Sequence, residues 1–172
     1  MAKTFAEQLC FEAVKNNGGA IDYVPEKLRT TELCLMAVKT CGSAIKYVPE
    51  ELRTKELWFT AIKNNGGMIQ DVPEKFKTPN FYLEAVKNYG RAIKFVPTKF
   101  KTYELCLAAA KNNSDAFKFI PTKFKTKKES LEAIKKNSYN FKEIPAKFKT
   151  KEFCLEAVKI NGLVLQYLQE KL

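Results

Sequence analysis

The 172-residue sequence contains no histidine, and this absence excludes several kinds of catalytic and metal site. Ser-His-Asp and Cys-His nucleophile systems, histidine general bases and histidine-containing zinc or iron sites all need an imidazole. The sequence also lacks a run of the roughly 18 to 20 apolar residues that a membrane-spanning helix needs. We therefore expect no membrane partner and no histidine-based enzyme centre.

Cysteine is sparse, and the five residues form an odd number that argues against a complete disulfide framework. The first residues do not resemble a secretory leader, because Glu7, Glu12 and Lys15 interrupt the apolar stretch. We therefore expect a cytoplasmic protein with reduced cysteines.

What the sequence does contain is a repeat of 24 residues. A Val-Pro or Ile-Pro pair recurs six times without insertion, from Val24-Pro25 to Ile144-Pro145, and a threonine opens six successive repeats. We treat residues 1–172 as a single repeat domain. Its repeats span residues 6–29, 30–53, 54–77, 78–101, 102–125, 126–149 and 150–172.

The first half of each repeat has the pattern of an amphipathic helix. Apolar residues stand three, four, five, seven and eight places after the threonine, as in the stretch from Leu33 to Val38. Threonine is a favoured N-cap, and in Thr78-Pro79 proline occupies the first helical position, which tolerates it. The pattern predicts helices of about ten residues, ended by a left-handed glycine such as Gly18. Ala6 replaces the threonine in the first repeat, so we expect its helix to lack this cap.

The second half of each repeat keeps helical spacing, as in Ile45, Val48 and Leu52, but contains a proline. Proline costs roughly 3 kcal/mol in a helix interior. We therefore expect either a kinked helix or a short helix followed by a one-turn helix starting at the proline. One such hairpin cannot bury its apolar face alone, so the predicted fold class is all-α. We expect an α-solenoid of seven helix-turn-helix repeats, each packed on its neighbours.

Residues 35–39 (LMAVK) and 42–52 (GSAIKYVPEEL) resemble a short helical repeat family of unknown function found in bacteria and their viruses. Units of that family have the form L-x-A-V-K-x-N-G-x-A-L-x-Y-V-P-E-E-L. The resemblance covers all seven repeats, implies a helical repeat fold with a scaffold or effector role, and supplies no catalytic residues. The sixth repeat departs most, with Glu129, Ser130 and Asn140 at positions that are leucine, cysteine and alanine elsewhere, which predicts a looser junction there.

No group of residues has the spacing of a catalytic or metal site. Four of the cysteines share one repeat position, which Trp58, Tyr82 and Ser130 occupy in other repeats, and this variation indicates packing. Recurring glutamates and the lysines three residues later, such as Glu12 and Lys15, form surface ion pairs of a few tenths of a kcal/mol. We expect no catalytic residue, no metal, no cofactor and no small-molecule substrate.

The distribution of charge is uneven. The chain has 30 Lys and Arg against 19 Asp and Glu, a net charge of +11, but residues 1–72 are neutral and the whole excess lies in residues 73–172. Basic surfaces of this kind bind nucleic-acid backbones or acidic protein surfaces, although a solvated surface without a partner would have the same composition. Four phenylalanines alternate with the lysines, and their register makes them core plugs instead of base-stacking platforms. They are Phe76, Phe100, Phe124 and Phe148.

We predict a partner-binding surface on repeats four to six. Its lysines come from the ends of the first helices and from the second halves of the repeats. Arg91 and Tyr139 come from the position after the turn glycine, which differs between repeats either for recognition or because loops tolerate change. The lysines are Lys94, Lys99, Lys101, Lys111, Lys118, Lys123, Lys125, Lys127, Lys128, Lys142, Lys147 and Lys149.

Two functions fit this surface. The first is a non-enzymatic repeat protein that binds a protein or ribonucleoprotein with an acidic face, and one form of it is an inhibitor of a nucleic-acid-dependent enzyme such as an RNA-guided nuclease. The alternative is direct, sequence-independent binding of RNA or DNA. The composition and the repeat do not identify the partner.

Overall fold

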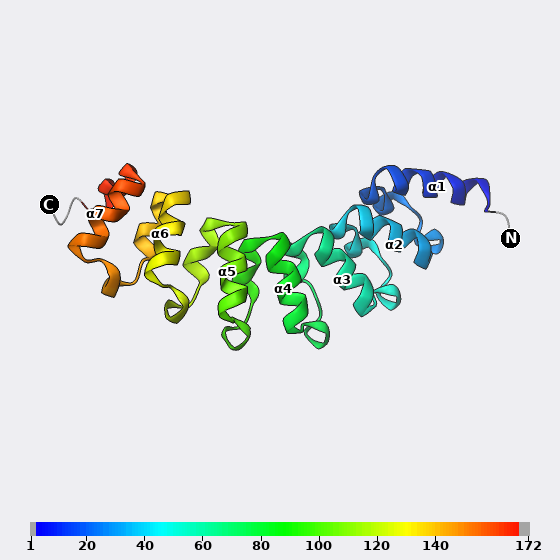
Figure 1. The fold of residues 1–172 in the computed structure, drawn as a ribbon. Coiled ribbons are helices and arrows are strands. Elements are labelled where there is room, and N and C mark those ends of the chain that lie inside the picture. The colour runs from blue at the N-terminus through cyan, green and yellow to red at the C-terminus, as the bar shows by residue number, and fades with distance from the viewer. Residues whose placement is uncertain (1–2, 169–172) are drawn as a thin grey trace. The chain divides into compact units, whose positions relative to one another are not determined.

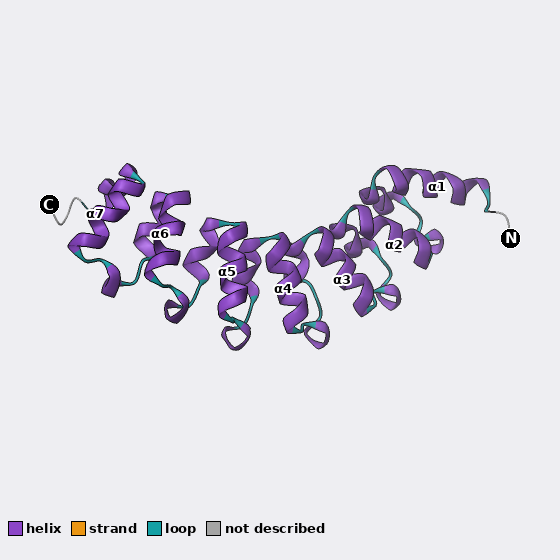
Figure 2. Ribbon diagram, in the orientation of Figure 1, coloured by secondary structure: helices purple, strands orange, loops and turns teal. Residues whose placement is uncertain are grey.

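The computed structural model describes residues 3–168, which form seven α-helices and thirteen 3-10 helices and contain no strand (Figures 1 and 2). The predicted all-α solenoid class is confirmed. The chain divides into two compact units, an N-terminal unit of residues 1–88 and a C-terminal unit of residues 89–172, and we describe each unit by itself.

Each repeat contributes one α-helix and, after it, 3-10 helices. The α-helices are α1 (Phe5–Asn16), α2 (Thr31–Thr40), α3 (Lys55–Asn64), α4 (Pro79–Asn88), α5 (Tyr103–Asn112), α6 (Lys127–Lys136) and α7 (Lys151–Ile160). The longer 3-10 helices are η1 (Gly18–Tyr23), η3 (Gly42–Tyr47), η5 (Gly66–Gln70), η7 (Gly90–Phe95), η9 (Ser114–Phe119), η11 (Ser138–Glu143) and η13 (Gly162–Tyr167). The one-turn 3-10 helices after the prolines are η2 (Glu26–Leu28), η4 (Glu50–Leu52), η6 (Glu74–Phe76), η8 (Thr98–Phe100), η10 (Thr122–Phe124) and η12 (Ala146–Phe148).

The predicted helix starts are confirmed. The hydroxyls of Thr30, Thr54, Thr102, Thr126 and Thr150 each accept a hydrogen bond from the backbone N–H three residues later. The fourth α-helix begins at a proline, as expected from its sequence. The expectation of an uncapped first helix was wrong. Helix α1 begins two residues earlier in its repeat than the other α-helices do in theirs. Thr4 caps it and forms a reciprocal capping box with Glu7.

The second half of each repeat contains 3-10 helices instead of a kinked α-helix. In the first repeat Val24 is extended, as a residue before proline prefers, and Pro25 precedes a one-turn helix. The bonds run from residue i to i+3, as in Val24 N–H to the Ile21 carbonyl at 3.1 Å. Of the two predicted alternatives, the short helix followed by a turn after the proline is therefore confirmed, with 3-10 geometry.

The predicted left-handed glycine caps were wrong. Among the described residues none has a positive φ, and the α-helices end at extended residues such as Asn17. The glycines instead begin the 3-10 helices at places where the next repeat comes very close. A Cβ on Gly90 would lie 2.5 Å from the carbonyl oxygen of Ala109, and one on Gly42 would overlap the carbonyl oxygen of Ala61. At these two junctions a side chain in place of glycine would collide with the next repeat, whereas the fifth and sixth repeats carry Ser114 and Ser138 at the same position.

Asparagines complete this junction between repeats. The Asn64 side-chain oxygen accepts the Gly42 N–H at 2.6 Å, and its amide nitrogen donates to the Lys39 carbonyl at 3.1 Å. In the C-terminal unit the Asn112 oxygen accepts the Gly90 N–H at 2.6 Å. Each such asparagine satisfies backbone groups where the α-helix of the preceding repeat gives way to its 3-10 helix. We call this pairing the glycine-asparagine lock.

The core of each unit lies between stacked repeats. Helices α2, α3 and α4 pack side by side in the N-terminal unit, and η7, η9, η11 and η13 stack in sequence in the C-terminal unit (Figure 1). Val38, Ile45, Ile93 and Phe117 are fully buried in these stacks. The shared cysteine position is part of the same core, since it is buried in the second to sixth repeats.

The sixth repeat accommodates its polar substitutions locally. The Ser130 hydroxyl donates to the Thr126 carbonyl at 2.7 Å, and the Asn140 amide donates to the Ala133 carbonyl at 3.0 Å. Helix α6 packs closely against α7, whereas towards the fifth repeat it packs more on η9 than on α5. Helix α6 therefore has fewer contacts with the α-helix of the fifth repeat than with that of the seventh.

Candidate interaction surface of the C-terminal unit

Six of the exposed predicted lysines lie on the 3-10 helices. They form two sets, and we call these sets the lysine rows. Each ammonium group lies 4.5 to 5.1 Å from the centroid of a neighbouring aromatic ring, as in Lys94 over Phe95 at 4.5 Å and Lys123 over Phe124 at 4.8 Å. None of the six forms an ion pair with a carboxylate in residues 3–168. The first row is Lys94, Lys118 and Lys142, and the second is Lys99, Lys123 and Lys147.

The corresponding positions of the N-terminal unit carry mixed charge. At the position of the first lysine row, the earlier repeats have Asp22, Lys46 and Gln70, and the Lys46 ammonium pairs with the Asp71 carboxylate of the next repeat at 3.8 Å. The position of Asp71 is held by uncharged aromatic residues in the fourth and fifth repeats and by Glu143 in the sixth. The lysine rows therefore give the C-terminal unit a positive surface that the carboxylates of the described chain do not neutralise.

Three other predicted lysines are structural. The Lys101 ammonium donates to the Phe119 carbonyl at 2.9 Å, and the Lys125 ammonium donates to the Glu143 carbonyl at 3.0 Å. Lys149 donates to a carbonyl of the preceding longer 3-10 helix at 3.4 Å. Burial lowers the pKa of both Lys101 and Lys125. These three cations hold backbone carbonyls, and we call them the cation clips.

The cation clips bring the two lysine rows together. Lys101 follows the one-turn helix that carries Lys99, and its ammonium reaches the carbonyl next to Lys118. Lys125 connects the turn of Lys123 to the end of η11 in the same way. Each of these two clips therefore connects the turn that carries a lysine of the second row to the end of the 3-10 helix that carries a first-row lysine of the next repeat.

The remaining predicted lysines lie on the α-helices. Lys111 is in the last turn of α5, and Lys127 and Lys128 are in the first turn of α6. The Lys127 ammonium pairs with the Glu156 carboxylate of the next repeat at 2.8 Å. Among the described residues, Lys127 is therefore a paired cation, unlike the lysines of the two rows. Lys111 and Lys128 are exposed.

Arg91 and Tyr139, the two predicted residues that are not lysines, differ in their surroundings. Arg91 is half-buried, and its Nε has no hydrogen-bond partner among the described residues. Tyr139 is exposed and meets Tyr167 edge to face, with ring centroids 6.3 Å apart, and the Lys142 ammonium lies 5.0 Å from the Tyr139 ring. Sequence reasoning missed Tyr167, because its contact with Tyr139 depends on stacking between repeats.

The four phenylalanines after the prolines were predicted to be core residues. They are half-buried, so they are more exposed than that prediction required. The preceding lysine lies over each ring, as Lys99 does over Phe100 at 4.9 Å. A base that stacked on one of these rings would therefore compete with the lysine.

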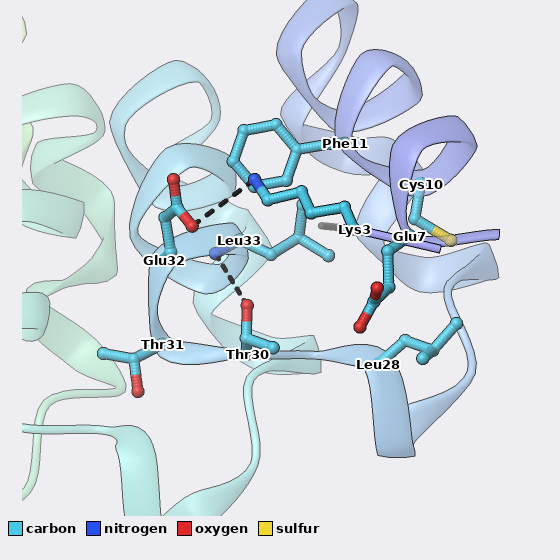
Figure 3. A pocket seen from close by; sticks show the side chains of 9 residues that line it. All are labelled: Lys3, Glu7, Cys10, Phe11, Leu28, Thr30, Thr31, Glu32 and Leu33. Carbon is cyan, nitrogen blue, oxygen red and sulfur yellow. Dashed lines mark hydrogen bonds and ion pairs between the residues drawn. The ribbon is translucent and has the colours of Figure 1, made fainter. Parts of the chain in front are cut away.

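The described residues hold no grouping of three or more potential metal ligands among His, Cys, Asp and Glu. A hollow of about 300 Å³ between α1 and α2 contains two pairs of interacting residues (Figure 3). The Lys3 ammonium lies 3.5 Å from the Glu32 carboxylate and 3.2 Å from the centroid of the Phe11 ring, and the Leu33 N–H donates to the Thr30 hydroxyl.

The fold and this surface define a helical repeat protein of the solenoid class. The chain belongs to the family described as "Domain of unknown function (DUF4116)", which matches residues 7–53, 31–77, 54–101, 78–125 and 130–172. Each match spans about two repeats, so together they cover almost the whole chain. Neither a curated protein nor a solved structure matches the sequence. No helix within residues 3–168 has the length and apolar character to cross a bilayer.

Proposed function

We propose that this protein is a non-enzymatic binding protein that uses the lysine rows to contact an acidic face of a protein or ribonucleoprotein in the cytoplasm. The observation that carries the proposal is the set of six exposed ammonium groups without a carboxylate partner in residues 3–168. Charged groups of one sign on successive repeats steer an oppositely charged surface and fix its register. A helical-repeat stack presents them at regular intervals.

The side chains near the lysine rows favour a protein partner. Tyr103 and Tyr139 are exposed on the same unit, and tyrosine contributes disproportionately to protein interfaces. Each half-buried phenylalanine ring already has a lysine ammonium over it, with which a stacking base would compete. One form of this proposal is inhibition of a nucleic-acid-dependent enzyme such as an RNA-guided nuclease. That form predicts loss of target cleavage when the protein is added to the assembled nuclease.

Reversing charge in the rows tests the main proposal. A variant carrying Lys99→Glu, Lys118→Glu, Lys123→Glu and Lys142→Glu leaves the cation clips intact. A matched control reverses three exposed lysines of the N-terminal unit, Lys27, Lys46 and Lys75. Immobilised wild-type protein should capture specific proteins from a nuclease-treated native extract, the row variant should lose them and the control should retain them. Equal capture by wild type and row variant, with unchanged circular dichroism, would contradict the proposal.

Direct binding of nucleic acid is the second candidate, and the unneutralised rows are the observation that favours it. Its affinity for a short single-stranded RNA or a DNA duplex should fall steeply with salt, because each neutralised phosphate releases counterions. A gel shift at two salt concentrations measures this. No shift at any protein concentration tested would reject this candidate, and capture that disappears after nuclease treatment would favour it over a protein partner.

A further inference from the structure

The last repeat exposes an apolar surface that the internal repeats bury. Leu165 is 48 % exposed, whereas Ile45 and Ile93, at the same repeat position, are fully buried. Ile21 is also fully buried although it belongs to the first repeat, so this position faces the following repeat. The open surface forms a groove of about 470 Å³, lined mainly by Cys154, Leu155, Val158, Leu165 and Leu168.

The first repeat exposes the opposite side of the same junction. Leu9 is 55 % exposed, whereas Leu33 and Phe153, at the same repeat position, are 2 % and 1 % exposed. Ala13 is exposed too, although its counterpart Ala157 is fully buried. These positions face the preceding repeat. The two ends of the chain therefore present the two complementary halves of the contact that joins one repeat to the next.

We propose that the chain associates head to tail, with the first repeat of a second copy stacked on the last repeat of the first copy. The charges at the two ends fit this arrangement. Inside the chain, Lys127 pairs with Glu156 of the next repeat at 2.8 Å. The residues at these two repeat positions are Lys151 in the last repeat and Glu12 in the first. Stacking a second copy brings Lys151 to its Glu12 in the geometry of an internal junction.

The glycine-asparagine lock gives a second, independent observation. Gly42 and Gly90 face a carbonyl of the next repeat, but a Cβ on Gly162 would meet nothing within 4 Å. Gly162 therefore lacks, within the described part of its own chain, the neighbours that Gly42 and Gly90 have in the next repeat. A second copy supplies both of them, since Ala13 provides the carbonyl and Asn16 provides the side-chain amide at the matching repeat positions.

The two contacting faces are different, so the association is heterologous. Such an interface leaves one free face of each kind at the ends of a dimer, and further copies add until a ring closes or an open chain forms. The lysine rows are not part of this contact. Head-to-tail association would therefore repeat the positive surface along an assembly without covering it.

Two single substitutions test the proposal because each blocks one face. Leu9→Glu places a charge on the first-repeat face, and Leu165→Glu places one in the last-repeat groove. Both side chains are about half-exposed in the single chain, so both variants are expected to fold. By sedimentation velocity, wild-type protein should exceed the mass of a dimer as concentration rises, and each variant alone should remain a monomer. An equimolar mixture of the two variants should form a complex of two chains and nothing larger.

A matched control is Leu163→Glu, which changes an exposed leucine of the last repeat that does not line the groove and should leave association unchanged. Lys151→Glu should weaken association, and Glu12→Lys in the other partner should restore it. A wild-type monomer at every concentration would overturn the proposal. So would self-association of Leu9→Glu alone, which would indicate contact between like faces, or a mixture that stays monomeric while circular dichroism shows both variants folded.

Discussion

Gly42 and Gly90 each face a main-chain carbonyl of the following repeat, and their N–H groups donate to asparagines of that repeat. A methyl group has no room there unless the two repeats separate. We expect Gly90→Ala to lower the free energy of unfolding by about 2 kcal/mol, as overpacked cores do. Gly162→Ala is the control, because nothing lies near its Cβ in the single chain, and it should be close to neutral at concentrations where the protein is a monomer. Urea unfolding measures both, and equal losses would contradict a packing role.

Cys106 has a pKa of about 11, because burial raises it and the nearby Lys101 and Lys123 only partly offset the burial. The thiol therefore stays protonated in the folded chain at pH values where the unfolded thiol ionises. The unfolded state then binds fewer protons, so this cysteine's contribution to stability falls as pH rises from about 9 towards about 11. Lys101, with its lowered pKa, acts in the opposite sense, since it loses its proton earlier in the folded state.

Comparing wild type with Cys106→Ala isolates the cysteine. Urea unfolding at neutral pH and at pH values across this range should show a smaller alkaline loss of stability in the variant. The variant is expected to be less stable at neutral pH, because a buried side chain is truncated. Parallel pH profiles for the two proteins would show that ionisation of this thiol is not coupled to folding.

At the scale of elements, the cation clips join each post-proline turn to the end of a 3-10 helix. The Lys125 side chain is nearly buried, at 7 % exposure, and its ammonium holds the Glu143 carbonyl while lying over the Phe117 ring. We expect Lys125→Ala to lower the free energy of unfolding by about 2 kcal/mol, the usual scale for a hydrogen bond from a charged donor. Lys123→Ala, two residues earlier and exposed, should change stability little. Thermal and urea unfolding distinguish the two, and similar losses would contradict the distinction between clip and row.

The sequence predicted the α-helices well because their signals are local. A threonine N-cap, a proline at the first helical position and apolar residues at helical spacing all act within a dozen residues. The 3-10 helices were harder, since the three-residue spacing of Ile45 and Val48 suits one turn of either helix type. The role of the glycines was misjudged because Gly90 contacts Ala109, nineteen residues away, and only the stacked structure shows that contact.

The roles of the surface lysines could be predicted only in part, because they depend on contacts between stacked repeats. Composition and repeat register located the excess charge in the later repeats, and the exposed rows at Lys99 and Lys123 agree with that expectation. No feature of the neighbouring sequence distinguishes Lys101 from Lys99. The Lys101 ammonium nevertheless donates to a carbonyl, whereas the Lys99 ammonium lies on the exposed surface over a ring. The difference depends on the neighbouring repeat that each side chain reaches.

At the scale of the whole molecule, the uneven charge affects stability as well as binding. The ammonium groups of the lysine rows on adjacent repeats repel one another, and salt screens that repulsion. We expect the melting temperature of the protein to rise between low and physiological ionic strength. A variant with Lys118→Gln and Lys142→Gln should melt higher than wild type at low salt and show a smaller rise. A melting temperature that falls with salt in both proteins would contradict this account.

The glycine-asparagine lock also determines how such a chain could change its length. The third repeat, residues 54–77, carries the residue types of both halves of the lock, with Asn64 bonded to Gly42 of the preceding repeat and Gly66 at the start of its own 3-10 helix, although Asn88 of the fourth repeat donates to Glu84 of its own helix. A tandem duplicate of these residues would present its asparagine to the glycine of the copy before it, so the new junction would need no new side chain. The second repeat has Thr40 in place of the asparagine and could not be duplicated in this way. The third repeat therefore carries the residues for a lock with a copy of itself, by which the molecule could be lengthened in steps of 24 residues.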